Sequence, residues 1–239
     1  MKRLFILVFI VVISSAFQMI PDSVRLKYRV KEIHFYLTKS ISYYTYNTDG
    51  NIICIRSSKG ANIVYEYYNG KIIKRTNDSL SHTSNVDTII LNGPGLAERI
   101  VNADQERIVP SILEYDKERH LIKNFALDDK GTVMGTGISK YENGNMTENH
   151  FFADEEKVST TYKFYTDKSN TIGYENMGMP FSGATSKNPT KEIKTVNAER
   201  KDTIVNSYYY HYDDLNRIKT KVIYNKTGKL IDSTGYVYY

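Results

Sequence analysis

Short segments that alternate hydrophobic and polar residues fill most of the chain, and turn-forming residues separate them. In one segment Ile63, Tyr65 and Tyr67 share a face, while the residues between them share the other. Alternation of this kind predicts a strand with one buried face. Between 115 and 165 the corners follow one another too closely for a crossover helix, so we expect antiparallel strands.

One corner sequence recurs between these segments. It runs aromatic, Asp or Asn, two variable positions, Gly or Asn, a basic residue and an aliphatic residue, as in 212–218 and again in 224–230. Asp or Asn closes such a turn with its side chain, and Gly or Asn accepts a positive φ. Full, partial or shortened copies begin at Tyr46, Tyr67, Leu91, Tyr115, Leu127, Tyr141 and Phe152. The recurrence predicts a series of β-hairpins.

These elements predict an all-β fold with a single domain over 17–239. It is one antiparallel meander of roughly fifteen short strands, and sheets above about 10 strands curl or split. We therefore expect a twisted, curled ribbon or an open barrel-like trough. Short helices at 30–37 and 97–107 are the local alternatives. A polar bridge at 77–85 and a long loop at 175–190 interrupt the strands, and the long loop is either a cap over the open end or a binding loop.

The N-terminal residues 1–16 predict a signal peptide. Lys2 and Arg3 precede an apolar run over 4–13, and small residues follow at 14–16. The run is shorter than the roughly 20 residues that a spanning helix needs, so a cleaved signal is favoured over an uncleaved anchor. We expect an exported protein, periplasmic or extracellular, with no transmembrane segment after cleavage.

Composition and charge exclude some partners and favour others. The formal net charge is +5, without a clustered basic stripe, so no nucleic-acid partner is expected. Tyrosine is unusually common, with 21 Tyr against 9 Phe and no Trp. Because tyrosine covers apolar area and keeps a polar hydroxyl, it suits a sheet between a thin core and water.

No catalytic, cofactor-binding or metal-binding set is predicted. The five histidines show no metal-ligand spacing, and His120 and His211 are expected as exposed corner residues. The paired carboxylates are adjacent in turns, where a glycosidase would need them facing across a cleft. Cys54 shares strand parity with Ile52 and is interpreted as a small buried residue.

At 212–218 and 224–230 the chain resembles the tyrosine–aspartate (YD) repeats of Rhs-type proteins, which build long hairpin ribbons that can wrap into shells. The wider layout, with 183–191 and a Tyr-rich final repeat, is similar to exported Bacteroidetes proteins of unknown function. The resemblance implies structure and names no catalytic residue. Asn216 and Arg119 depart from it, because they stand where the repeat usually has Gly.

The leading functional hypothesis is a non-enzymatic, monomeric binding or scaffolding protein for a protein or glycan of the cell envelope. Its candidate ligand contacts are Tyr208, Tyr210, Tyr212, Met179 and Phe181. One alternative is an envelope glycan hydrolase, which needs two carboxylates in one pocket. The other is an outer-membrane β-barrel. Against it stand Lys219 and Lys221 on one face of 218–224 and Thr220 on the other, since a lipid-facing side should be apolar for about 25 Å.

Overall fold

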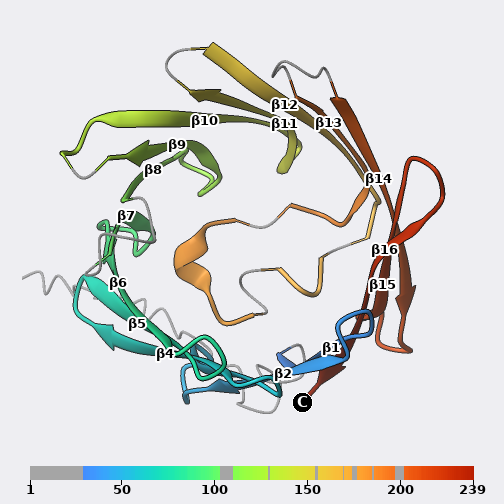
Figure 1. The fold of residues 1–239 in the computed structure, drawn as a ribbon, viewed down its shortest axis with the longest axis horizontal. Coiled ribbons are helices and arrows are strands. Elements are labelled where there is room, and N and C mark those ends of the chain that lie inside the picture. The colour runs from blue at the N-terminus through green and yellow to red at the C-terminus, as the bar shows by residue number, and fades with distance from the viewer. Residues whose placement is uncertain are drawn as a thin grey trace, which may run out of the picture.

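The chain folds into a closed β-barrel (Figure 1). The computed structural model describes residues 29–102, 110–128, 130–153, 156–168, 170–173, 177–184, 186–196 and 202–239. Within them, sixteen antiparallel strands form one sheet in sequence order. The predicted signal segment lies outside the described residues. The strands are β1 (Val30–Phe35), β2 (Ser40–Tyr46), β3 (Ile52–Ser57), β4 (Ala61–Tyr68), β5 (Lys71–Asp78), β6 (Thr83–Leu91), β7 (Ala97–Asn102), β8 (Ser111–Tyr115), β9 (Leu121–Leu127), β10 (Val133–Glu142), β11 (Asn145–Ala153), β12 (Glu156–Tyr165), β13 (Pro189–Val196), β14 (Asp202–Tyr212), β15 (Ile218–Asn225) and β16 (Leu230–Tyr238).

The first and last strands close the barrel. Val30 lies opposite Tyr238, and Phe35 lies opposite Thr234. An open sheet would leave two unpaired edges, and closure removes both. The all-β antiparallel meander of roughly fifteen strands is therefore confirmed, with sixteen strands in the described residues. The expected open trough is wrong, because these strands form a closed barrel.

The recurring corner sequence makes one kind of turn. At 213–217 the backbone N–H of Asp213 donates to the carbonyl of Arg217, and the N–H of Asn216 donates to the carbonyl of Asp213. Asp213 Oδ1 also accepts the N–H groups of Leu215 and Arg217, at 3.0 and 2.9 Å. The same backbone pair closes the turns that start at Asn47, Asn92, Asp116, Asp128 and Asn225. These six predicted corners are thus confirmed, whereas the copy that begins at Phe152 lies partly outside the described residues.

The glycine position of each corner has a positive φ even where the residue is not glycine. Arg119 has φ 70° and Asn216 has φ 56°. Asn tolerates this conformation well, whereas Arg is held in it against a steric cost. The two departures from the YD pattern are therefore changes of residue at an unchanged backbone geometry.

Bulges beside the corners shift strand parity. Thr45 lies opposite Cys54, but the next residue, Tyr46, lies opposite Ile52, with a register shift between the two pairs. Ile52 is fully buried and belongs to the interior cluster. Cys54 pairs instead with Val64, on the other face from Tyr65. The prediction that Cys54 and Ile52 share a face is therefore wrong, because a bulge inserts a residue between them.

Lys221 of β15 faces inwards, which corrects part of the argument against a barrel, whereas Lys219 is exposed at a register shift. Lys221 pairs with Tyr210 of the interior cluster, and its Nζ lies 3.7 Å from Asp232 Oδ2. Thr220 and Val222 therefore face outwards. Lys221, which argued against contact with lipid, therefore belongs to the inner wall of the barrel.

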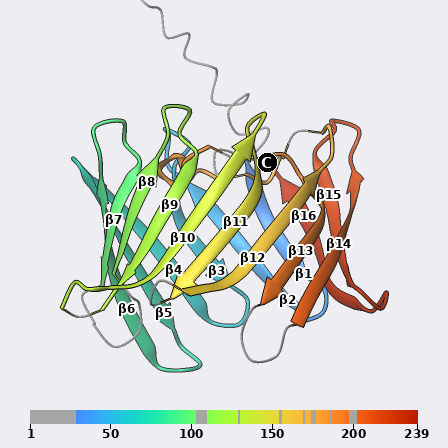
Figure 2. The same cartoon turned by 90° about the horizontal axis from the view of Figure 1, so that it is seen from above.

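The segment 166–188, here called the plug, connects β12 to β13 and lies inside the barrel (Figure 1). It carries the short 3-10 helix η1 (Pro180–Ser182). Seen from the side, the plug lies towards the barrel end where the C-terminus is found, here called the plug end (Figure 2). The loop predicted at 175–190 falls largely within it. The polar bridge 77–85 holds the end of β5 and the start of β6.

Candidate functional site in the barrel lumen

An apolar anchor fixes the plug to one side of the inner wall. Phe181 and Met177 are buried against the wall, and the ring of Phe181 lies 6.4 Å from that of Tyr65. Buried residues of β1 to β7, β15 and β16 complete this cluster. Full burial of a side chain such as Phe or Met stabilises a fold by about 1.5–3 kcal/mol. The plug is therefore part of the barrel's core.

Two glycines let the plug approach the wall backbone. Gly178 O accepts the N–H of Ile52 at 2.9 Å, and a Cβ on Gly178 would lie 2.7 Å from that nitrogen. A Cβ on Gly183 would lie 2.7 Å from the carbonyl oxygen of Arg119, which accepts the N–H of Ala184 at 2.8 Å. Both glycines have positive φ, 70° and 89°. Glycine is required here by conformation and by space.

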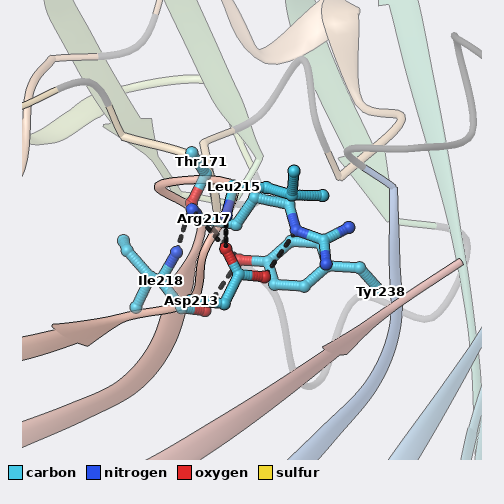
Figure 3. A network of polar contacts seen from close by, with 6 residues as sticks. All are labelled: Thr171, Asp213, Leu215, Arg217, Ile218 and Tyr238. Atoms are coloured by element: carbon cyan, nitrogen blue, oxygen red, sulfur yellow. Dashed lines mark hydrogen bonds and ion pairs between the residues drawn. The ribbon is translucent and has the colours of Figure 1, made fainter.

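A closed ring of hydrogen bonds ties the plug to β15 and β16 (Figure 3). The N–H of Ile218 donates to Thr171 Oγ1 at 2.8 Å, and the hydroxyl of Tyr238 donates to the carbonyl of Ile218 at 2.8 Å. The Thr171 hydroxyl lies 3.2 Å from that of Tyr238, so it is left to donate to it. Thr171 of the plug is thereby fixed between two strands.

The neighbouring corner adds a charged pair to this region (Figure 3). Arg217 Nε donates to Asp213 Oδ2 at 2.7 Å, and the guanidinium lies 4.5 Å from the ring centre of Tyr238. Burial alone would raise the pKa of Asp213. Hydrogen bonds from the Arg217 backbone and guanidinium and from the Leu215 backbone outweigh it, so the pKa of Asp213 lies below its ordinary value.

Tyrosines line the lumen at the plug end and bond to neighbouring strands. Tyr238 ends β16 and donates to Ile218 at the start of β15, beyond the last ladder pair of those strands, Thr220 with Gly235. The same bond from a late tyrosine of one strand to an early carbonyl of the strand before it recurs five more times in the described residues: Tyr46–Val30, Tyr67–Ile52, Tyr141–Leu121, Tyr165–Met146 and Tyr210–Pro189. Each carbonyl lies beyond the last ladder pair of its two strands, so the hydroxyl satisfies a backbone acceptor that this ladder does not reach. This role accounts for six of the 21 tyrosines.

Two adjoining cavities lie between the plug and the wall of β9–β13, on the side away from the apolar anchor. The rim cavity, of about 330 Å³, is lined at the plug end by residues that include Tyr165, Ser186 and Pro189. The inner cavity, of about 340 Å³, is lined by Leu121, Asn124, Ser139, Tyr141, Met146, Asn149, Thr161, Lys163, Ser182, Ala184, Glu192 and Lys194. Four residues line both cavities: Tyr141, Met146, Lys163 and Ala184. The plug therefore fills one side of the lumen and leaves polar space on the other.

Three Lys–carboxylate pairs lie in the lumen. Lys74 Nζ lies 3.0 Å from Asp87 Oδ2, and Asp87 is only 2% exposed. Lys163 Nζ lies 3.4 Å from Glu192 Oε2. Lys221 and Asp232 form the third pair. Lys194 forms no ion pair with any described residue, so the wall beside the inner cavity carries one uncompensated positive charge.

The five predicted ligand contacts belong to the plug or the inner wall. Phe181 is buried in the apolar anchor, and Met179 packs against it. Tyr210 donates to Pro189, and the Tyr212 hydroxyl accepts the Asn188 side chain at 3.4 Å. Tyr208 faces inwards, since it pairs with Ile223 opposite Asp232. Their contact with a ligand stays a prediction, whereas the structure gives Tyr212 a contact with the plug, Tyr210 a bond to the start of β13 and Phe181 a place in the apolar anchor.

One histidine corner resembles a metal site but has another explanation. Ligand atoms of Asp116, Glu118 and His120 lie within 4.8 Å of one another. Asp116 Oδ1 accepts the backbone N–H of His120, and Asp116 Oδ2 lies 2.9 Å from its Nδ1. The ring of His120 stacks on Tyr141 at 4.5 Å, so its side chain is 12% exposed, which corrects the expected exposed histidine. The corner turn accounts for these contacts.

The polar residues of the inner cavity were not singled out by the sequence. Asn149, Thr161 and Lys194 lie on strands whose alternation predicts two faces. Alternation does not tell which face encloses a lumen. The signal that could have found them is a row of polar residues at matched register on β10–β13.

The outer wall is mixed in character. Tyr162, Phe164 and Tyr209 form an exposed aromatic region over β12–β14, with exposures of 42%, 51% and 57%. Elsewhere ion pairs face outwards: Arg75 lies 3.0 Å from Glu66, and Glu148 binds both Lys140 and His150. Among the described residues no helix is both long and apolar enough to cross a bilayer.

Solved structures share this architecture. A porin-like protein from Bacteroides uniformis superposes with a TM-score of 0.63 and 13% identity, covering 88% of this chain and 96% of that chain. A porin-like protein from Bacteroides vulgatus superposes with a TM-score of 0.54 and 14% identity, covering 88% and 99%. No family model matches the sequence, and a search of curated proteins finds no match. At these identities the likeness shows the fold, which is that of porin-like β-barrels.

Proposed function

We propose that the chain is a porin-like barrel of the cell envelope whose lumen, narrowed by the plug, admits a small polar solute. The observation that carries this is the pair of adjoining cavities between the plug and β9–β13. They form the polar side of a lumen whose other side is sealed by the apolar anchor. This proposal replaces a general binding or scaffolding role with one located inside the barrel.

The plug is the part that would set the size of the passage. It is fixed at several separate places: by Phe181 in the apolar anchor, by Gly178 on β3, and by Thr171 between β15 and β16. At its other end Ser186 Oγ accepts the N–H of Met146 at 2.9 Å. Because the plug is held at both ends and in its middle, it narrows the lumen as a fixed element. A narrow, permanent passage is therefore expected.

Porin-like neighbours and the predicted export signal support an outer-membrane position. The exposed aromatic region over β12–β14 is suited to lipid. An Arg or Lys side chain facing lipid near the midplane, as Arg75 or Lys140 would, costs about 2–4 kcal/mol. The outward ion pairs of Glu66 and Glu148 therefore favour a second candidate: a barrel that stands in water and holds its solute in the lumen.

A conductance experiment tests the proposal. The full chain, refolded in detergent, is added to a planar bilayer beside a variant in which 171–184 is replaced by a short Gly-Ser linker. We expect small, discrete conductance steps for the wild type and larger steps for the variant, because the lumen is wider without the plug. Insertion without any conductance in either protein overturns the proposal. A wild type that stays monodisperse without detergent and does not insert supports the second candidate.

A further inference from the structure

A row of polar side chains crosses the wall of the inner cavity. Ser139 lies opposite Asn149, Asn149 lies opposite Thr161, and Thr161 lies opposite Lys194. All four line the cavity. Directly paired side chains on one face of a sheet are close neighbours. The row therefore presents amide, hydroxyl and ammonium groups side by side to one space.

Most of these groups have free hydrogen-bonding capacity. Asn149 Nδ2 donates to Ser139 Oγ at 3.0 Å, which orients both side chains. Thr161, Lys194 and Asn124 make no side-chain hydrogen bond or ion pair with another described residue. A Cβ on Gly137 would collide with Asn124 Oδ1, so this glycine makes room for the amide in the lumen. Unpartnered polar groups around a cavity are the features by which a pocket fixes a ligand.

The charges of the cavity favour a ligand with a single negative charge. Lys163 is neutralised by Glu192 at 3.4 Å, which leaves the charge of Lys194 uncompensated. A second negative charge on the ligand would face Glu192, and like charges brought together disfavour binding. The carboxylate of Glu192 can instead accept a hydrogen bond from a hydroxyl group. An anion with one carboxylate and several hydroxyls matches this set of groups.

We infer that the inner cavity binds a small hydroxylated carboxylate, a sugar acid in chemical class. The carboxylate of the ligand pairs with the ammonium group of Lys194. The hydroxyls of the ligand form hydrogen bonds with Thr161, Asn149 and Glu192. The inference rests on the proposed role of the lumen and names the class of solute. The cavity's volume of about 340 Å³ is at the lower end for ligand pockets, about 300–1,000 Å³, and fits a molecule of monosaccharide size.

Calorimetric titration of the full chain with D-glucuronate, D-glucose and acetate tests the inference. We expect D-glucuronate to bind at least about tenfold more tightly than either of the others, because only it offers both the charge and the hydroxyls. Lys194→Gln is expected to weaken glucuronate binding about tenfold or more, and Lys194→Arg to keep most of it. Equal binding of glucose, unchanged binding by Lys194→Gln, or no binding of glucuronate by the wild type overturns the inference.

Glu192→Gln is expected to change glucuronate affinity in the opposite direction from Lys194→Gln. This change releases Lys163 from its carboxylate at 3.4 Å and gives the cavity a second free ammonium group. Glucuronate is expected to bind several-fold more tightly, and its affinity to depend more steeply on salt. Weaker binding by this variant contradicts the assigned charge arrangement. Lys226→Gln, at an exposed far-end corner, is the matched control and should bind as the wild type does.

The experiments distinguish a failure of the porin-like role from a failure of the sugar-acid site. Conductance with unchanged glucuronate binding in Lys194→Gln removes the sugar-acid site and leaves the porin-like role. Glucuronate binding that depends on Lys194, in a barrel that does not conduct, keeps the site and favours the second candidate for the barrel. Thermal melting of every variant identifies any that is lost through misfolding.

Discussion

The hydroxyl of Tyr238 donates to the backbone carbonyl oxygen of Ile218 at 2.8 Å. This bond joins the end of β16 to the start of β15, beyond their last ladder pair. Five similar bonds occur at the same end of the barrel within the described residues. Tyrosine therefore contributes to stability here through its hydroxyl as well as its ring.

Tyr238→Phe removes one such bond and also breaks the ring of hydrogen bonds through Thr171. The carbonyl of Ile218 then loses a donor in a partly buried position. We expect the free energy of unfolding to fall by about 1–2 kcal/mol, measured by chemical denaturation. Tyr209→Phe, on the exposed outer face, is the control and should change little. Equal effects of the two changes would contradict the role of the hydroxyl.

Gly178→Ala tests the seating of the plug. The new methyl would lie 2.7 Å from the nitrogen of Ile52, at a residue with φ 70°. Gly70→Ala is the matched control, because Gly70 has φ 73° and nothing lies near its missing Cβ. We expect Gly178→Ala to destabilise the protein by about 1–3 kcal/mol more than the control does. A similar loss of stability in both variants would show that the plug shifts at residue 178 and accommodates the methyl group without cost.

Asp213→Asn tests the charged corner and predicts a pH dependence. The folded-state pKa of Asp213 is lowered, so its stabilisation is present above the unfolded pKa of about 3.9 and is lost as pH falls through the folded pKa. The variant keeps the amide oxygen for the turn, as Asn225 does at its own corner. At neutral pH we expect a loss of about 1 kcal/mol, from the bond to Arg217.

The difference between wild type and Asp213→Asn should be constant above the unfolded pKa and shrink once the pH falls below about 3.9 towards the folded pKa. Denaturation curves at several pH values measure it. Asp214→Asn, at an exposed position of the same corner, is the control. A difference between wild type and Asp213→Asn that also stays constant below the unfolded pKa would show that the charge of Asp213 contributes nothing.

Asn216→Gly tests the positive φ at the corner. Asn216 has φ 56°, a conformation that glycine adopts without steric cost. We expect this variant to be within about 1 kcal/mol of the wild type, whereas Asn216→Val should lose about 1–2 kcal/mol. Thermal melting separates the two outcomes. A strongly destabilised glycine variant would show that the Asn side chain itself is needed.

Hairpins were predictable from the sequence because each corner is a local event. The Asp213 side chain bonds to backbone groups no more than four residues away, so a short pattern contains the whole interaction. Closure was not predictable in this way. Because Val30 and Tyr238 lie at opposite ends of the described chain, no local sequence pattern indicates that they pair.

The lumen was harder to predict for a second reason. Strand alternation places Lys194 and Lys221 on a polar face, but the same pattern fits a water-exposed face of an open sheet. Only closure turns that face into an interior. Bulges add a further difficulty, since the parity that related Cys54 to Ile52 is broken between them. The plug's apolar residues, Met177, Met179 and Phe181, were recognisable as anchors but not their position inside the barrel.

The pairing of β1 with β16 has a consequence for biogenesis. A chain that lacks Leu230–Tyr238 has a sheet with two unpaired edges and no closed wall around the plug. Because unpaired edges can pair with other chains, such a chain is expected to aggregate more readily until the final strand is in place.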